Sequence, residues 1–86
     1  MYALSDRTEA HVRNGVAVPR LSTRQLECLA WVQEGKSAHD IGMILGISGR
    51  TVDGHLAGAC AALGVRRRIQ AVIKARGLGL LGDAGA

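Results

Sequence analysis

The sequence predicts an all-α domain built as a bundle of four helices. No segment alternates apolar and polar residues as a half-buried strand does. Three serine-capped helix starts follow the same pattern along the chain, and a glycine follows each of these helices. Apolar residues recur at helical spacing within four segments. Together these features favour helices packed on one another rather than a sheet.

The first helix is expected over residues 23–34. In "LSTRQL", Ser22 and Gln25 have the spacing of a capping box, and Leu21 and Leu26 that of a hydrophobic staple. Gly35 is the expected stop. The side chains expected to face inward are Leu26, Leu29, Ala30 and Trp31.

The second and third helices are expected over residues 38–45 and 49–63. Ser37 and Ser48 are their caps, with Asp40 completing the first pattern, and Gly46 and Gly64 are their stops. The inward-facing residues of the second are Ile41, Ile44 and Leu45, and those of the third are Val52, Leu56, Ala59 and Leu63.

A fourth helix is expected over about 67–76, ending at Gly77, with Ala71, Val72 and Ala75 facing inward. Residues 21–81 would form the domain. Two interpretations stay open for residues 1–20: an arm or linker throughout, or a short helix after Ser5 that ends at Gly15, followed by an extended Val16–Pro19. Residues 82–86 are expected to be a frayed, disordered tail.

Composition limits the possible functions. The chain has 86 residues and a formal net charge of +4, and residues 21–81 hold eight Lys or Arg against four Asp or Glu. This balance is compatible with a polyanionic partner. No apolar run approaches the roughly 18 residues of a membrane span, so no membrane partner is expected. Cys28 and Cys60 are expected to be buried free thiols in a reducing cytosol.

The connection between the second and third helices is the most informative feature. Only Gly46 and Ile47 separate Leu45 from Ser48, so the two helices must cross steeply, and Gly46 can supply the positive φ that the turn needs. Gly42 removes a side chain where the third helix would press close. A short helix, a glycine turn and a longer helix are typical of the helix-turn-helix that binds DNA, although an ordinary helical hairpin has the same spacing.

Residues 21–81 closely resemble the LuxR-type (GerE-like) helix-turn-helix domain, in the version found at the C-terminus of quorum-sensing regulators. The matching pieces are "LSTRQLECLAW", "EGKS", "DIGMILGIS", "RTVDGHL", "LGV" and "RIQAVIKARGLGLL". The resemblance implies a four-helix domain that regulates transcription, whose third helix enters the major groove and whose fourth forms a two-fold dimer. The 20 preceding residues are too few for a sensor or receiver domain, so a complete chain would resemble the stand-alone, single-domain members; the alternative is a domain excised from a longer regulator.

Candidate DNA-binding residues lie around the turn, on the third helix and before the fourth. They are Lys36, Ser37, His39, Ser48, Arg50, Thr51, Asp53, Gly54, His55, Ala57, Arg66 and Arg67. The family often has Lys, Arg or Asn at the positions matching Asp53, Gly54 and Ala57, and this chain departs from that pattern. Two interpretations follow: either small residues allow close approach, with Asp53 accepting from cytosine, or the helix is a degenerate remnant.

The remaining expectations concern partners. Ile69, Ile73 and Arg76 on the fourth helix are the candidate homodimer interface, the alternative being that one isoleucine packs under residues 1–20. The expected function is a cytoplasmic bacterial regulator that binds double-stranded DNA on the nucleoid. The alternative is an interaction protein that pairs with a full-length LuxR-type regulator and modulates it. No enzyme activity, catalytic residue, metal, cofactor or small-molecule ligand is expected, because no residue pattern supports one.

Overall fold

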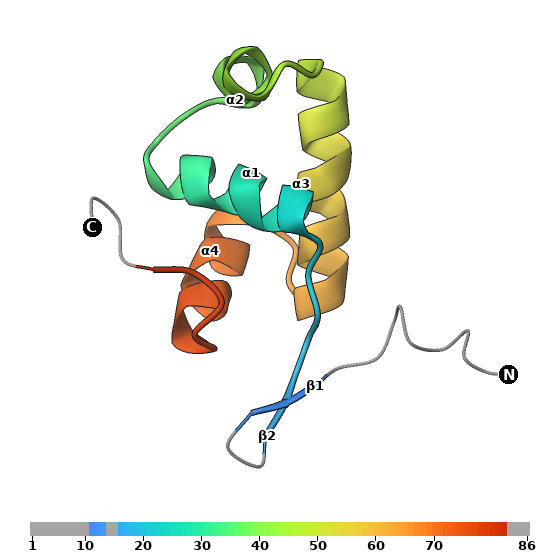
Figure 1. The fold of residues 1–86 in the computed structure, drawn as a ribbon, viewed down its shortest axis with the longest axis vertical. Helices are drawn as coiled ribbons and strands as arrows, with labels where there is room; N and C mark the ends of the chain where they lie inside the picture. Colours follow the sequence, from blue (N-terminus) through green and yellow to red (C-terminus); the bar gives the residue numbers. More distant parts are fainter. Residues whose placement is uncertain (1–10, 14–15, 83–86) are drawn as a thin grey trace, which may run out of the picture.

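Four helices form a single bundle in the computed structural model, which describes residues 11–13 and 16–82. They are α1 (Thr23–Gln33), α2 (Ala38–Leu45), α3 (Gly49–Leu63) and α4 (Arg68–Gly77). Figure 1 shows α2 at one end of the long α3, with α1 meeting its middle and α4 beside its other half. The predicted all-α helix-turn-helix bundle is confirmed, and α2 and α3 have the predicted bounds.

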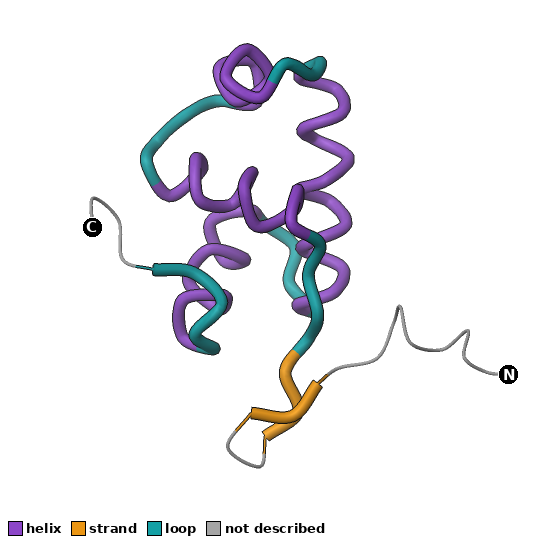
Figure 2. Tube along the Cα trace, viewed as in Figure 1, coloured by secondary structure: helices purple, strands orange, loops and turns teal. Residues whose placement is uncertain are grey.

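A β-hairpin precedes the bundle. Strands β1 (His11–Arg13) and β2 (Val16–Val18) pair antiparallel, with His11 opposite Val18 and Arg13 opposite Val16. Figure 2 shows the hairpin projecting away from the helices. The short helix considered after Ser5 is therefore wrong at residues 11–13, which are paired strand. Its remaining residues, 5–10 and 14–15, lie outside the described part of the chain.

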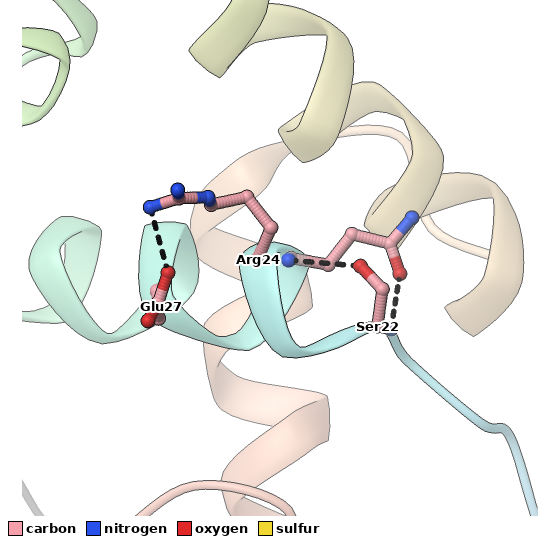
Figure 3. A network of polar contacts seen from close by, with 4 residues as sticks. Ser22, Arg24 and Glu27 are labelled. Atoms are coloured by element: carbon pink, nitrogen blue, oxygen red, sulfur yellow. Dashed lines mark hydrogen bonds and ion pairs between the residues drawn. The ribbon is translucent and has the colours of Figure 1, made fainter. Parts of the chain in front are cut away.

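The helix starts follow from local hydrogen bonds. Ser22 Oγ accepts from the Gln25 amide at 3.0 Å, and Gln25 Oε1 accepts from the Ser22 amide at 2.8 Å, so the predicted capping box is confirmed. Figure 3 shows this network beside the Arg24–Glu27 ion pair. Ser37 caps α2 and Ser48 caps α3 in the same way, each accepting from the amide three residues later.

The hydrophobic core lies where α1, α3 and α4 meet and extends to α2. Its buried members are Leu21, Cys28, Leu29, Ile41, Val52, Leu56, Ala59, Cys60, Leu63, Ala71, Val72 and Ala75. The predicted stripes of α3 and α4 are confirmed, whereas Leu26, Ala30, Trp31 and Leu45 are only half-buried. Ile44 was expected to face inward but is 46% exposed, because Ile41 and Gly42 take up the side of α2 that meets the bundle.

The end of α4 differs slightly from the prediction. Gly77 is the last residue of the helix rather than its stop, and the left-handed turn falls at Gly79, with φ of 78°. The Leu80 amide then donates to the Ala75 carbonyl, and the chain folds back over the bundle. Leu78, Leu80 and Leu81 pack against the core, and Gln33 Nε2 donates to the Gly82 carbonyl at 3.0 Å. This return adds apolar cover that a 10-residue helix could not provide alone.

Candidate nucleic-acid interface

The position of α3 is determined by its tight connection to α2. Gly46 has a left-handed φ of 74°, which lets the chain reverse within two residues. The Ile47 amide donates to the Gly42 carbonyl at 2.9 Å. A Cβ at Gly42 would lie 2.5 Å from the Ile47 carbonyl oxygen and 3.1 Å from the Gly49 nitrogen. The backbones of α2 and α3 therefore touch here, and no side chain fits between them.

The two faces of α3 have opposite characters. Val52, Leu56, Ala59 and Leu63 are buried and hold the helix to the bundle. The opposite face is exposed and consists of Arg50, Asp53, Gly54, Ala57 and Ala61. Nothing lies within 4 Å of a Cβ placed at Gly54, so open space surrounds the middle of this face. No other part of the described chain therefore covers the backbone of α3 at Gly54.

A second glycine within α3, Gly58, has a packing reason. A Cβ at Gly58 would lie 2.7 Å from Gln25 Nε2, and the Oε1 of the same side chain closes the capping box of α1. Gly58 therefore makes room for a side chain that stabilises the neighbouring helix. His55, which the sequence placed among the DNA-binding candidates, is half-buried.

The starts of α2 and α3 lie next to each other and form one polar edge. A Cβ at Gly49 would lie 3.5 Å from His39 Cα, so the first turns of the two helices are adjacent. Six predicted residues lie on this edge and are exposed: Lys36, Ser37, His39, Ser48, Arg50 and Thr51. We call these six residues the N-terminal edge. It combines two cations with the amide-rich, partly positive ends of two helices, which favours phosphate.

All three hydroxyls of the N-terminal edge already have hydrogen-bond partners. Ser48 Oγ lies 2.9 Å from Thr51 Oγ1 and also accepts from the Thr51 amide. The Ser37 hydroxyl accepts from the Asp40 amide at 3.1 Å. The first role of both serines is therefore capping. Each hydroxyl keeps at most part of its hydrogen-bonding capacity for a ligand.

A second group of charged residues lies where α3 passes the start of α4. Arg66, Arg67 and Arg68 are all exposed, and Gln70 Oε1 accepts from the amides of Arg66 and Arg67. Arg68 Nη2 lies 3.0 Å from Asp53 Oδ1. The sequence analysis singled out Arg66 and Arg67 but not Arg68. Its partner is 15 residues away, and no local pattern indicates such a pairing.

A hollow of about 380 Å³ lies beside this ion pair. Its lining includes Asp53, Ala57, Cys60, Ala61, Arg66 and Arg68. The predicted residues Asp53, Ala57 and Arg66 are therefore brought together, in a region that begins one helical turn after Arg50. Ala57 and Ala61 carry no charge, so Arg66, just before α4, and Arg68, its first residue, supply the positive charge here.

The outer face of α4 is apolar in the middle. Ile69 is 54% exposed and Ile73 is 64% exposed, and Arg76 is exposed beyond them. Both isoleucines are open to solvent, and most of residues 1–20, which were the alternative cover for one of them, lie outside the described part of the chain. Lys74 lies on the same helix, but its Nζ donates to the Leu63 carbonyl and closes the end of α3.

The described cysteine and histidine side chains are, by residue type, possible metal ligands. Among the described residues, no group of three or more His, Cys, Asp or Glu side chains comes together. Cys28 and Cys60 are free and buried, as predicted. Burial raises the pKa of the Cys28 thiol, with the neighbouring Arg24 opposing that shift and Glu27 adding to it. No helix of the described part is long and apolar enough to cross a membrane.

Comparison with known proteins agrees with this geometry. Residues 19–75 match the model for "Bacterial regulatory proteins, luxR family". The chain is 49% identical over 61 residues to the transcriptional activator protein VanR of Vibrio anguillarum, covering 69% of this chain and 25% of VanR. It is 45% identical over 65 residues to the transcriptional activator protein LuxR of Aliivibrio fischeri, covering 76% and 26%. The chain thus spans about a quarter of the length of these relatives.

Solved structures give the same result at the level of the fold. The transcription factor GerE superposes with a TM-score of 0.69 at 34% identity, covering 72% of this chain and 92% of GerE. SdiA of Escherichia coli superposes with a TM-score of 0.70 at 32% identity, covering 81% of this chain and 30% of SdiA. The likeness to GerE extends over nearly all of that chain.

Proposed function

Because this chain belongs to the LuxR family of bacterial regulatory proteins, we propose that α3 enters the major groove of double-stranded DNA and that two copies bind a two-fold site. The chain is a helix-turn-helix DNA-binding domain of transcriptional regulators, not an enzyme. Its proposed place of action is the bacterial cytoplasm, on the nucleoid. The observation that carries the proposal is the exposed face of α3. Nothing covers this face at Gly54, and the buried residues of the opposite face pack the helix against the bundle.

Phosphate contacts supply most of the affinity in this proposal. After Arg50, α3 carries no further Lys or Arg, so few cations of its own reach the groove. The N-terminal edge provides Lys36, Arg50 and two helix ends on one side. Arg66 and Arg67 provide charge on the other side, at the start of α4. Such contacts position a protein on DNA without reading its sequence, so we expect clear docking with modest discrimination.

A salt titration tests this division. We expect the purified protein to bind both random and genomic duplex DNA at low salt and to lose affinity steeply as salt rises. Arg50→Ala, or Arg66 and Arg67 to Ala together, should weaken binding to every sequence and flatten the salt dependence by about one unit per lost phosphate contact. Unchanged affinity of both variants at low salt would remove these residues from the interface.

The dimer is the second part of the proposal. A protein that binds a two-fold DNA site must place its two recognition helices about one DNA turn apart, roughly 34 Å. Ile69 and Ile73 form an exposed apolar pair on α4, and we propose that they meet their symmetry mates, with Arg76 at the rim. The pair is small compared with a stable interface. The free dimer is therefore weak and is completed on DNA.

A second candidate function is favoured by the weak charge of α3. If the protein binds duplex DNA poorly even at low salt, the same α4 face would serve to pair with a full-length LuxR-type regulator and modulate it. The two functions are distinguished by mixing the protein with such a regulator on its operator. An antagonist releases the regulator from DNA, whereas an independent DNA binder competes only at sites that it occupies by itself.

A further inference from the structure

An ion pair links the exposed face of α3 to the start of α4. Arg68 Nη2 and Asp53 Oδ1 are 3.0 Å apart, and their side chains are 43% and 57% exposed. The pair lines the hollow beside Ala57 and Ala61, so it lies on the flank of the face that the proposed function turns toward DNA. Asp53 is the one carboxylate on the exposed face of α3, and its Oδ1 accepts a hydrogen bond from Arg68 Nη2.

Electrostatics makes an unpaired Asp53 unfavourable at this place. A bare carboxylate would stand among phosphates, and like charges brought together in an interface oppose binding. The partner guanidinium cancels that charge without adding net repulsion. In water an exposed pair contributes little, but it strengthens when a docked duplex excludes solvent. Docking therefore favours keeping the pair intact over moving Arg68 to a phosphate and leaving Asp53 alone.

We propose that Asp53 and Arg68 act as one base-reading unit in which Arg68 is the positioning residue. Arg68 neutralises Asp53 and orients it through Oδ1. The second carboxylate oxygen, Oδ2, then accepts a hydrogen bond from the N4 amino group of a cytosine in the major groove. The small neighbours Ala57 and Ala61 leave room for the base edge to reach it. This inference rests on the proposed docking of α3.

A double-mutant cycle tests the unit. Asp53→Ala, Arg68→Gln and the double variant are titrated with random-sequence duplex DNA at low salt, and circular dichroism checks that each is folded. Arg68→Gln should weaken binding about tenfold when Asp53 is present, and less than about twofold in the Asp53→Ala background. Arg67→Gln is the matched control, because it removes the same charge one position away and should cost the same in both backgrounds. Arg68→Lys, which keeps the charge, should restore part of the loss.

Selection from a randomised duplex library provides the second readout. The unmodified protein should enrich cytosine at one position of each half-site, and both Asp53→Ala and Arg68→Gln should lose that enrichment. The loss in Arg68→Gln is decisive, because Asp53 itself is still present there.

Three results would overturn the proposal. Equal losses for Arg68→Gln in both backgrounds, with a flatter salt dependence, would make Arg68 a phosphate contact instead. A cytosine preference that survives Asp53→Ala, or no such preference at all, would remove the reading role. If the unmodified protein binds no duplex at low salt, the proposed function itself fails, and that outcome is distinct from the other two.

Discussion

The space around a helical glycine indicates its role, and this space differs at Gly42, Gly54 and Gly58. At Gly42 the backbone of the next helix occupies the space that a Cβ would need. At Gly58 the obstacle is the end of the Gln25 side chain, which can move. At Gly54 nothing is near. Since a mid-helix glycine costs about 1 kcal/mol relative to alanine, Gly54 is unfavourable for the folded domain and gains nothing from packing within it.

Gly42→Ala and Gly54→Ala should therefore change the stability in opposite directions. The first substitution pushes a methyl group against the Ile47 carbonyl and should lower the free energy of unfolding by about 2 kcal/mol. The second should raise it by up to about 1 kcal/mol. Urea denaturation followed by circular dichroism measures both. A stable Gly42→Ala variant would mean that α2 and α3 can separate without cost.

Gly54→Ala also tests which interpretation of the small face of α3 holds. If the backbone of α3 approaches the bases closely, the added methyl group should weaken binding to duplex DNA although the fold is more stable. An unchanged affinity would support the interpretation of α3 as a degenerate remnant.

At the scale of the element, each of the first three helices begins at a serine whose hydroxyl accepts from a backbone amide. The same interaction serves different surroundings. Ser22 starts α1, remote from the N-terminal edge, and its box is closed by Gln25. Ser48 starts α3 within that edge, and its hydroxyl also lies 2.9 Å from that of Thr51. α4 lacks such a serine, and Gln70 Oε1 instead accepts from the amides of Arg66 and Arg67, just before the helix begins.

Ser22→Ala and Ser48→Ala form a matched pair. Each should lower the free energy of unfolding by about 1 kcal/mol, because each leaves a capped amide without its acceptor. Only Ser48→Ala should also weaken DNA binding, since it loosens the first turn of α3 and removes a hydroxyl from the N-terminal edge. Thermal denaturation and a DNA titration on both variants measure these effects. Equal DNA affinities would place Ser48 outside the interface.

At the scale of the whole molecule, the large apolar side chains that are exposed within the described part of the chain lie in two places. Ile69 and Ile73 lie on α4, and Met43 and Ile44 lie on α2, where Met43 is 71% exposed. Single exposed apolar residues are ordinary on a protein surface. The α4 pair is distinguished by the proposed dimer, in which it would hold two recognition helices at a fixed separation.

Ile73→Glu should give a folded monomer that binds a two-fold DNA site poorly, because the proposed contact would place two like charges opposite each other. Met43→Glu is the control, since it puts the same charge at an equally exposed apolar site on α2 and should leave association unchanged. Analytical sedimentation with circular dichroism makes the comparison. An Ile73→Glu variant that stays folded and dimeric would move the interface to another surface.

The sequence by itself determined the helices, their starts and the stripes that bury α3 and α4. These depend on signals within a few residues: a serine three positions before an amide, a glycine at a left-handed stop, apolar side chains every three or four residues. Tertiary structure alone decided that Ile44 of α2 faces solvent, that the Gln25 side chain packs against Gly58, and that Arg68 forms an ion pair with Asp53. The pairing of β1 with β2 does have a local signal that the all-α prediction missed, because Asn14-Gly15 between the two strands is typical of a two-residue hairpin turn. Tertiary structure also decided the return of residues 78–82 over the core. The features that only the tertiary structure decided depend on which surfaces meet when the helices pack, and most join residues far apart along the chain, so no local pattern predicts them.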